Sequence, residues 1–405
     1  MEHADEIDVE TSGIAAGGAG VARLVDGMVV FVDGALPGER VRVHIDERRR
    51  RHGRGHVLEV LDASPLRVPS PCLHGDRGCG GCDWLHVAPS GQEGLRAAIV
   101  RDALERIGRL EVPEIRVGED SAPGGGHRTT VRAAVAGGRA GIRHRGSHEP
   151  VRHDSCLVAH PLVEEVLVDG RFGDASGVVI RAGARTGERM VIVSPRAEEV
   201  SVPSDVVVVG DDELRAGRRV WIHEEVAGRR WRISGRSFFQ SNPAAADHLV
   251  EIVAAAVAGA GPGALVDLYA GVGLFAGTVG DGREVVAVER SASSVADLRV
   301  NLAGRSPAPT IVRVPVEDWT ASPAGVVVAD PAREGLGKAG ARAVLAAAAG
   351  RIVLVSCDAG ALGRDARLLV DGGYRLVSVE LVGMFGFTSN VEVVTVFDRL
   401  DPGGD

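Results

Sequence analysis

The chain has 405 residues, carries a formal net charge of −9, and is 45% hydrophobic, 25% charged and only 3% aromatic. This composition is that of an ordinary soluble globular protein, and the length suffices for two or three domains. No charged-then-apolar leader opens the sequence, and glycine, proline or a charge interrupts every long apolar run. We therefore expect no signal peptide, no transmembrane span and a cytoplasmic location.

The first 60 residues predict a small barrel. Short β-type runs alternate with glycine turns between Ile7 and Ala63, and five or so strands in so short a stretch are typical of an OB-like nucleic-acid module. The runs are Val21–Leu24, Met28–Val32, Arg40–Ile45 and His56–Leu61. We assign the barrel to residues 7–63, and the prolines that follow mark a linker.

The cysteines indicate a metal site. There are five: Cys72, Cys79, Cys82, Cys156 and Cys357. An odd number in a chain without a leader is poor material for a disulfide framework. The CxxC pair lets two thiolates reach one metal, and with Cys72 and Cys156 it makes a plausible four-thiolate site. Four cysteines fit a structural zinc ion or an iron–sulfur cluster, and nearby His74 and His86 keep a mixed zinc site open.

Residues 64–236 predict a central domain that includes the cysteine loop. Gln92–Arg109 has apolar residues near helical spacing and is expected to be an amphipathic helix. Residues 127–235 alternate β-type runs with glycine-rich turns, which favours a mostly antiparallel α+β domain. Arginines cluster at 128–145 and again in Arg48–His56. Local patches, more than net charge, decide whether a protein binds nucleic acid.

From residue 237 to residue 402 the pattern changes to alternating strands and helices, which predicts a doubly wound parallel sheet of Rossmann-like type. The expected strands are Ala264–Leu268, Val285–Val288, Val326–Ala329, Ile352–Val355, Leu376–Leu381 and Val391–Phe397. The expected helices are Ala244–Ala258, one beginning at Phe275–Val279, Ser291–Leu302, Ala339–Ala349 and Gly360–Asp371.

A glycine-rich loop follows the first of these strands. In DLYAGVG, Gly271 and Gly273 let the backbone approach a ligand at the start of a helix. Glu289 ends the next strand and suits a ribose. This loop alone fits a nicotinamide site, an S-adenosylmethionine site or a purely structural turn.

Two further strand ends carry reactive groups. Asp330 follows Val326–Ala329 and is either a cofactor contact or a solvated turn residue. Cys357 follows Ile352–Val355, at the edge of the sheet where ligands gather in α/β folds. A cysteine there is either a small core residue or a nucleophile.

The ordered motifs resemble those of the RNA uracil-5-methyltransferases, specifically the 23S rRNA 5-methyluridine type with an N-terminal TRAM domain, over nearly the whole chain. They are GERVRV within residues 13–43, the first four cysteines, SFFQSN at 237–242, DLYAGVG, DPAREGL, SCDAGALGRD and the closing Val391-Glu392. The chain departs from the family in four places: DPAR replaces DPPR, SCDA replaces SCNP, GFT at 386–388 replaces PHT, and HRTT at 127–130 replaces YRNK.

The resemblance implies a class I methyltransferase domain and a covalent mechanism. The Cys357 thiolate would add to C6 of uracil, C5 would take the methyl group from S-adenosylmethionine, and Glu392 would remove the C5 proton. The target base must leave its stack, and Phe238, Phe239, Phe385 or Phe387 would stack on it. By the same resemblance Gln240, Tyr269, Glu289 and Asp330 join the glycine loop in contacting the cofactor, and Cys72, Cys79, Cys82 and Cys156 hold a [4Fe–4S] cluster, with zinc as the alternative.

We therefore expect a monomeric enzyme that makes 5-methyluridine in structured RNA, with 23S rRNA favoured over tRNA and no membrane partner. Two hypotheses from other classes remain open. A nicotinamide-dependent oxidoreductase would give Cys357 and Glu392 no role. A catalytically inactive relative would bind RNA without methylating it.

Overall fold

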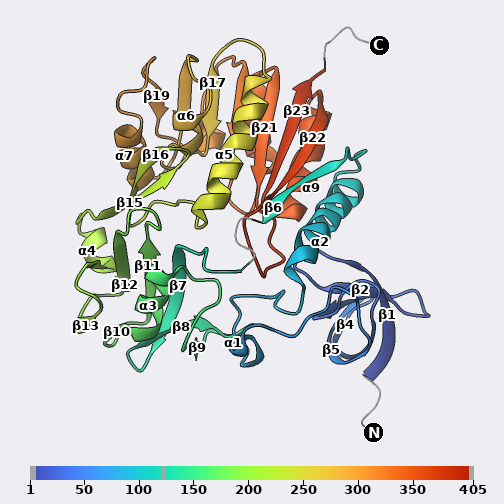
Figure 1. Cartoon of the computed structure of the whole chain (residues 1–405). Coiled ribbons are helices and arrows are strands. Elements are labelled where there is room, and N and C mark those ends of the chain that lie inside the picture. Colours follow the sequence, from blue (N-terminus) through green and yellow to red (C-terminus); the bar gives the residue numbers. More distant parts are fainter. Residues whose placement is uncertain (1–5, 121–123, 401–405) are drawn as a thin grey trace.

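The computed structural model describes residues 6–120 and 124–400 (Figure 1). The expected end of the catalytic domain, residue 402, lies outside these ranges. Three parts follow one another from the blue to the red end of the chain: a barrel, a central sheet and a large C-terminal sheet. Across the described residues, no helix is both long and apolar enough to cross a membrane.

The N-terminal part is a closed barrel of five strands in the order β1-β2-β3-β5-β4. The strands are β1 (Glu6–Ile14), β2 (Gly20–Arg23), β3 (Val29–Asp33), β4 (Arg40–Arg48) and β5 (His52–Asp62). Alternate valines such as Val30, Val32, Val41 and Val43 are fully buried and fill the barrel, as the period of two along a strand requires. The barrel expected from the sequence is confirmed. The arginine-rich Arg48–His56 forms its exposed β4–β5 hairpin.

The central part is a six-stranded sheet in the order β14-β12-β11-β7-β8-β9, antiparallel except for the pair of β12 and β14. Its strands are β7 (Thr130–Ala136), β8 (Arg139–Arg143), β9 (Pro150–Arg152), β11 (Gly177–Ala182), β12 (Arg189–Ser194) and β14 (Val206–Gly210). Around it lie α1 (Leu73–Asp76), α3 (Pro161–Asp169), α4 (Asp211–Arg215), the small pair β10 (Arg171–Phe172) with β13 (Val200–Ser201), and the hairpin of β15 (Trp221–Val226) and β16 (Arg229–Ser234).

The C-terminal part is an eight-stranded sheet in the order β19-β18-β17-β20-β21-β23-β22-β6. The strands are β17 (Leu265–Leu268), β18 (Val285–Val288), β19 (Thr310–Val312), β20 (Val326–Ala329), β21 (Arg351–Ser356), β22 (Tyr374–Gly383) and β23 (Val393–Arg399). The helices are α5 (Pro243–Ala258), α6 (Leu274–Thr278), α7 (Ala292–Asn301), the 3₁₀ turn η2 (Val316–Asp318), α8 (Gly337–Ala346) and α9 (Ala359–Asp371). The expected doubly wound domain is confirmed.

One strand, β23, departs from the parallel sheet that the sequence predicts. That strand runs antiparallel to both of its neighbours, β21 and β22. The reason lies in the connection: only residues 384–392 separate β22 from β23, and parallel neighbours need a crossover of a dozen residues or more.

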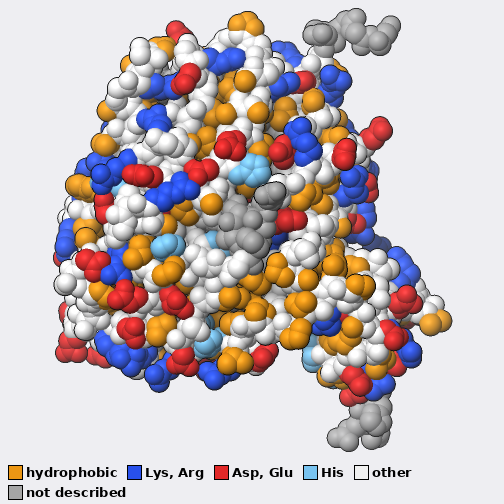
Figure 2. Space-filling model, viewed as in Figure 1, with side chains coloured by type: hydrophobic (Ala, Val, Ile, Leu, Met, Phe, Trp, Pro, Cys, Tyr) orange, Lys and Arg blue, Asp and Glu red, His pale blue; other side chains and the backbone are white. Residues whose placement is uncertain are grey.

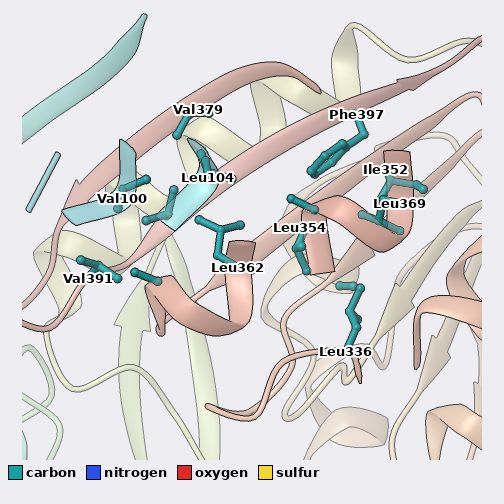
Figure 3. Packing of buried hydrophobic residues seen from close by; sticks show 14 of the residues in the cluster. Val100, Leu104, Leu336, Ile352, Leu354, Leu362, Leu369, Val379, Val391 and Phe397 are labelled. Carbon is teal, nitrogen blue, oxygen red and sulfur yellow. The ribbon is translucent and has the colours of Figure 1, made fainter. Parts of the chain in front are cut away.

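The eighth strand comes from the segment before the central sheet. β6 (Ile115–Asp120) pairs in parallel with β22, and α2 (Pro89–Asp102) with the π-helical turn η1 (Ala103–Ile107) packs beside it. Figure 3 shows Val100 and Leu104 of this segment meeting Leu362 of α9 in one apolar cluster. Although the sequence places these elements before the central sheet, they cover the C-terminal sheet. On the face shown in Figure 2, basic and acidic side chains are interspersed, so the net charge of −9 is not gathered in one patch there.

Candidate active site

Four of the predicted site residues each follow directly after a strand of the C-terminal sheet. Tyr269 follows β17, Glu289 follows β18, Asp330 follows β20 and Cys357 follows β21. These four strands are parallel neighbours, so their carboxyl ends lie at the same edge of the sheet. The fold therefore brings the four residues to one edge, where α/β proteins bind their ligands.

The Glu289 carboxylate binds the backbone of the glycine loop. Gly271 and Gly273 have φ angles of +55° and +96°, a region that side chains other than glycine rarely adopt. The Glu289 carboxylate accepts hydrogen bonds from the amides of Gly271 (2.9 Å) and Ser291 (2.6 Å). A Cβ on Gly273 would lie 2.5 Å from the side chain of Leu298. The loop thus needs glycine for both conformation and space.

The buried carboxyl group of Asp267 fixes the helix that follows the glycine loop. Asp267 is fully buried and accepts a hydrogen bond from the Ala276 amide at the start of α6 (2.8 Å). Burial raises the pKa of Asp267 to about 8. Asp267 is therefore suited to holding the start of α6 in place, out of reach of a ligand.

Cys357 and Glu392 lie at the ends of two paired strands. Ser356 of β21 lies opposite Val393 of β23 in the antiparallel register, and Cys357 and Glu392 are the next residues along the two chains. The negative charge of Glu392 contributes to the raised pKa of the Cys357 thiol, so the two groups lie near each other. Glu392 is 3% exposed, whereas Cys357 is only partly buried. A thiol and a carboxyl group therefore lie near each other at the edge of the sheet that also carries the glycine loop.

The pKa values of Cys357 and Glu392 both depend on the charge of Asp330. Burial raises the pKa of the Cys357 thiol to about 11, and the negative charges of Glu392 and Asp330 add to the shift while Arg333 opposes it. Burial also raises the pKa of Asp330 and of Glu392, and for Glu392 the charge of Asp330 adds to the effect. The site therefore favours a cationic ligand, whose charge would stabilise the ionised forms of all three groups.

The segment 237–242 enters the same region. Phe238 is 66% exposed, whereas Phe239 and Gln240 are buried, and Asn242 caps α5 by accepting a hydrogen bond from the Ala245 amide (3.2 Å). Of the four phenylalanines considered for stacking, Phe239 and Phe387 lie in the apolar cores, and Phe385 is half-buried. Of the four, Phe238 is therefore the most exposed ring.

The four cysteines Cys72, Cys79, Cys82 and Cys156 line one cavity of about 20 Å³. Burial raises the pKa of the Cys79 and Cys156 thiols, and that of Cys82 to about 12. Among the residues that the structure describes, no group of three or more His, Cys, Asp or Glu side chains is arranged to hold a metal ion. The thiols thus share a cavity and have the donor chemistry of a metal site, but they do not form a compact ligand set.

The histidines near this cavity differ from expectation. His86 is not part of the cavity lining. His153, which the sequence analysis did not consider, lines it, stacks on His74 at 4.8 Å, and places Nε2 3.3 Å from Cys79 Sγ. Its position three residues before Cys156 was the signal that could have identified it.

Two buried charged residues also escaped the sequence analysis. Asp297 has no exposed surface and accepts four hydrogen bonds from the β16 region. Arg96 is 1% exposed and donates to backbone carbonyls of the 384–392 loop. For Arg96 a signal existed, because it lies at i−3 and i−4 from Ile99 and Val100 on the apolar stripe of α2, where a charge demands a partner.

Comparison with known proteins agrees with this architecture. The family model described as TRAM domain matches residues 3–58. An uncharacterized RNA methyltransferase of Streptomyces avermitilis is 35% identical over 98% of this chain and 99% of that protein. The 23S rRNA (uracil(1939)-C(5))-methyltransferase RlmD of Halomonas elongata is 32% identical over 96% of this chain and 89% of that protein.

Among solved structures, the tRNA (uracil-54, C5)-methyltransferase of Pyrococcus abyssi in complex with S-adenosyl-L-homocysteine matches with a TM-score of 0.72 and 23% identity, over 96% of this chain and all of the other. At this identity the likeness shows the fold. The similarity to RNA methyltransferases along the whole chain removes the support for a nicotinamide-dependent oxidoreductase. The chain belongs to the TRAM-containing RNA methyltransferase family that includes the uracil-C5 enzymes, and it is an S-adenosylmethionine-dependent RNA methyltransferase.

Proposed function

We propose that this protein methylates C5 of a uridine in structured RNA, with 23S rRNA as the favoured substrate, through a covalent bond between Cys357 and C6 of the base. The observation that carries the proposal is that Cys357 and Glu392 lie near each other, one residue beyond the paired Ser356 and Val393, at the edge of the sheet that also carries the glycine loop. Uracil C5 is a poor nucleophile until a group adds at C6, so the reaction needs one nucleophile and one base in this relation.

The steps use residues in these positions. The Cys357 thiolate forms a bond to C6, and the C5–C6 π electrons move to give an enolate. S-adenosylmethionine supplies the methyl group, which C5 takes as the carbon–sulfonium bond breaks. Glu392 then accepts the C5 proton, the electrons of that bond restore the C5–C6 double bond, and the C6–sulfur bond breaks to release the Cys357 thiolate.

The charges at the site suit this sequence of steps. In the free protein Asp330 and Glu392 oppose ionisation of Cys357. A bound sulfonium carries a positive charge, which counters both carboxylates and lowers the thiol pKa where the nucleophile is needed. We assign the cofactor contacts to Gln240, Tyr269, Gly271, Gly273, Glu289 and Asp330, and base stacking to the exposed ring of Phe238.

We further infer that Cys72, Cys79, Cys82 and Cys156 hold a [4Fe–4S] cluster, with zinc as the alternative. Support comes from their shared cavity and from burial, which disfavours the free thiolates that a bound metal would stabilise. Iron, sulfide and zinc analysis of protein purified without oxygen distinguishes the two. Cys79→Ser should lose whichever metal is present.

The relatives favour rRNA, because the Halomonas elongata enzyme at 32% identity is named for 23S rRNA. A tRNA substrate is the second candidate, because the Pyrococcus abyssi enzyme that matches in fold is named for a tRNA uracil. Either substrate would place the protein in the cytoplasm, and we expect it to act as a monomer.

The test is anaerobic incubation with labelled S-adenosylmethionine and total RNA that lacks the modification, followed by nucleoside analysis of separated rRNA and tRNA. We expect label in 5-methyluridine from rRNA, and none with Cys357→Ala. Label in tRNA alone would overturn the substrate choice. If metal-loaded protein labels neither RNA yet binds it, the protein is an inactive relative and the proposed reaction is refuted.

A further inference from the structure

The loop that carries Glu392 is held by residues from outside its own sheet. Residues 384–392 connect β22 to β23, and Glu392 is the last of them. At its two ends the loop is fixed by the hydrogen bond from the Val382 amide to the Glu392 carbonyl (2.8 Å) and by the Asn242 side chain, which donates to the Met384 carbonyl (3.3 Å). Its middle is held by α2 and by residues 72–84, which we call the cysteine segment.

The cysteine segment provides three hydrogen bonds to the middle of the loop. The Asp83 carboxylate accepts from the Ser389 amide (3.0 Å) and from the Ser389 hydroxyl (2.5 Å). The Trp84 amide donates to the Phe387 carbonyl (3.0 Å). Asp83 immediately follows Cys82, whose side chain lines the four-cysteine cavity. The loop that carries Glu392 is therefore hydrogen-bonded to the residue that follows Cys82, one of the predicted metal ligands.

Helix α2 completes the attachment. Gln92 accepts a hydrogen bond from the Phe387 amide (2.8 Å), and buried Arg96 donates to the Phe385 carbonyl (2.6 Å) and to the Thr388 carbonyl (2.7 Å). The Arg96 guanidinium also lies 5.5 Å from the ring of Trp84, which is fully buried. The cysteine segment and α2 thus support each other as well as the loop.

A turn of the barrel also contacts Trp84 and the loop. The Trp84 indole donates to the Gly18 carbonyl (3.4 Å). A Cβ on Gly18 would lie 2.6 Å from the indole nitrogen and 2.8 Å from the Ser389 Cβ, so the glycine lets the barrel turn approach both. The barrel, the cysteine segment and the catalytic sheet therefore meet at residues 387–389.

We propose that Asp83 is a positioning residue for Glu392, and that through it the cysteine segment fixes where the base stands relative to C5 of the uracil. Only Asn390 and Val391 separate Ser389 from Glu392, a span of about 10 Å at most, so movement of Ser389 reaches the carboxylate. The Asp83–Ser389 hydrogen bonds are charge-assisted, as are those of Arg96 to the same loop, and of the bonds from the cysteine segment and α2 they are the nearest in sequence to Glu392. The inference rests on the proposed function, since it presumes that Glu392 removes the C5 proton.

The order of the chemical steps gives this proposal a signature. Addition of Cys357 and methyl transfer precede proton removal, so a displaced Glu392 slows only the release of the methylated RNA from the enzyme. The covalent RNA–protein complex should then accumulate and be visible on a denaturing gel. A variant that merely destabilises the fold would form less of this complex, because every step would suffer.

The variants are Asp83→Ala, which removes both hydrogen bonds, and Ser389→Ala, which removes only the hydroxyl bond and lies far from the cysteines in the sequence. Asp76→Asn is the matched control, since it alters an exposed carboxylate of the same cysteine segment. Glu392→Gln serves as the reference for blocked release. Metal content, thermal unfolding and affinity for S-adenosylhomocysteine are measured for each protein.

We expect Asp83→Ala to lower turnover by roughly tenfold to a hundredfold, as a misplacement of about 1 Å can do, with unchanged KM for S-adenosylmethionine and more covalent complex than wild type. Ser389→Ala should show the same signature more weakly, and Asp76→Asn should match wild type. If Asp83→Ala loses its metal or unfolds, Ser389→Ala decides.

Wild-type turnover in both variants, or lower turnover without extra covalent complex, would overturn the inference. A different result would refute the proposed function itself, and with it this inference: no 5-methyluridine from wild type and no covalent complex with Glu392→Gln.

Discussion

Asp297 of α7 binds β16 and the residue Ser237 that follows it, and its replacement by asparagine gives a strong test of the structure. Its Oδ1 accepts from Arg232 Nε (2.7 Å) and from the Ser234 hydroxyl (2.8 Å). Its Oδ2 accepts from the Ser234 amide (2.8 Å) and from the Ser237 hydroxyl (2.6 Å). An asparagine presents an NH₂ group to one of these two pairs of donors, whichever way it is turned, and leaves Arg232 without its charge partner.

The expected cost follows from burial. Asp297 has no exposed side-chain surface, and the Arg232 side chain is 18% exposed. Breaking a buried ion pair costs about 3–5 kcal/mol, and a hydrogen bond to a charged group contributes about 1.5–3 kcal/mol. The two figures describe the same contacts, so they are not added together, and Arg232 also reaches some water. We therefore expect Asp297→Asn to lower the free energy of unfolding by about 3 kcal/mol.

The measurement is thermal and urea unfolding of Asp297→Asn beside Asp174→Asn, a control in which the carboxylate is exposed. A loss of about 3 kcal/mol should lower Tm by roughly 6–12 °C, whereas the control should stay within about 0.5 kcal/mol of wild type. Affinity for S-adenosylhomocysteine should also fall, since Ser237 leads into Gln240. A change of less than about 1 kcal/mol in Asp297→Asn would refute the reasoning that this network holds the hairpin to α7.

Two further predictions concern ionisation. Burial raises the pKa of Glu39, but hydrogen bonds from Arg67 and from the Leu36 and Ser64 amides lower it more, so its net pKa is below the usual value. Its stabilising effect is therefore present above the unfolded pKa of about 4.3 and is lost as pH falls through the lower folded pKa. The Tm difference between wild type and Glu39→Gln should shrink from pH 6 to pH 3, and a constant difference would contradict this. Because burial raises the pKa of Cys357 to about 11, its alkylation by iodoacetamide, followed by mass spectrometry of its peptide, should speed up about tenfold per pH unit between pH 7 and 10; a rate that levels off between pH 9 and 10, as it does for a thiol with the ordinary pKa of about 8.5, would exclude the shift.

The parts of the site that the sequence predicts are those set by local pattern. Tyr269, Glu289, Asp330 and Cys357 each follow a short apolar run, so their arrival at one edge of the sheet follows from the strand pattern alone. The exposure of Phe238 and the burial of Phe239 could not be separated in this way, because neighbouring aromatic residues carry no signal of which one faces the core.

What the sequence could not predict depends on contacts between distant segments. The pairing of β6 with β22 joins residues near 115 to residues near 380, and nothing local to Ile115–Asp120 indicates its partner. The attachment of Ser389 to Asp83 is of the same kind. The antiparallel β23 was predictable in principle, because the connection that precedes it is too short for a crossover.

The place of β6 has a consequence for how the protein is made. The chain completes α2 and β6 early, leaves for the central sheet, and returns to build the strand that β6 pairs with only near its end. During synthesis the apolar face of α2 and the unpaired edge of β6 therefore stay exposed until β22 has been made. Exposed surface of this kind is prone to aggregation and is bound by chaperones. A recombinant fragment beginning at residue 237 would lack both elements and should aggregate. A fragment that joins residues 89–120 to residues 237–400 through a short linker should remain in solution.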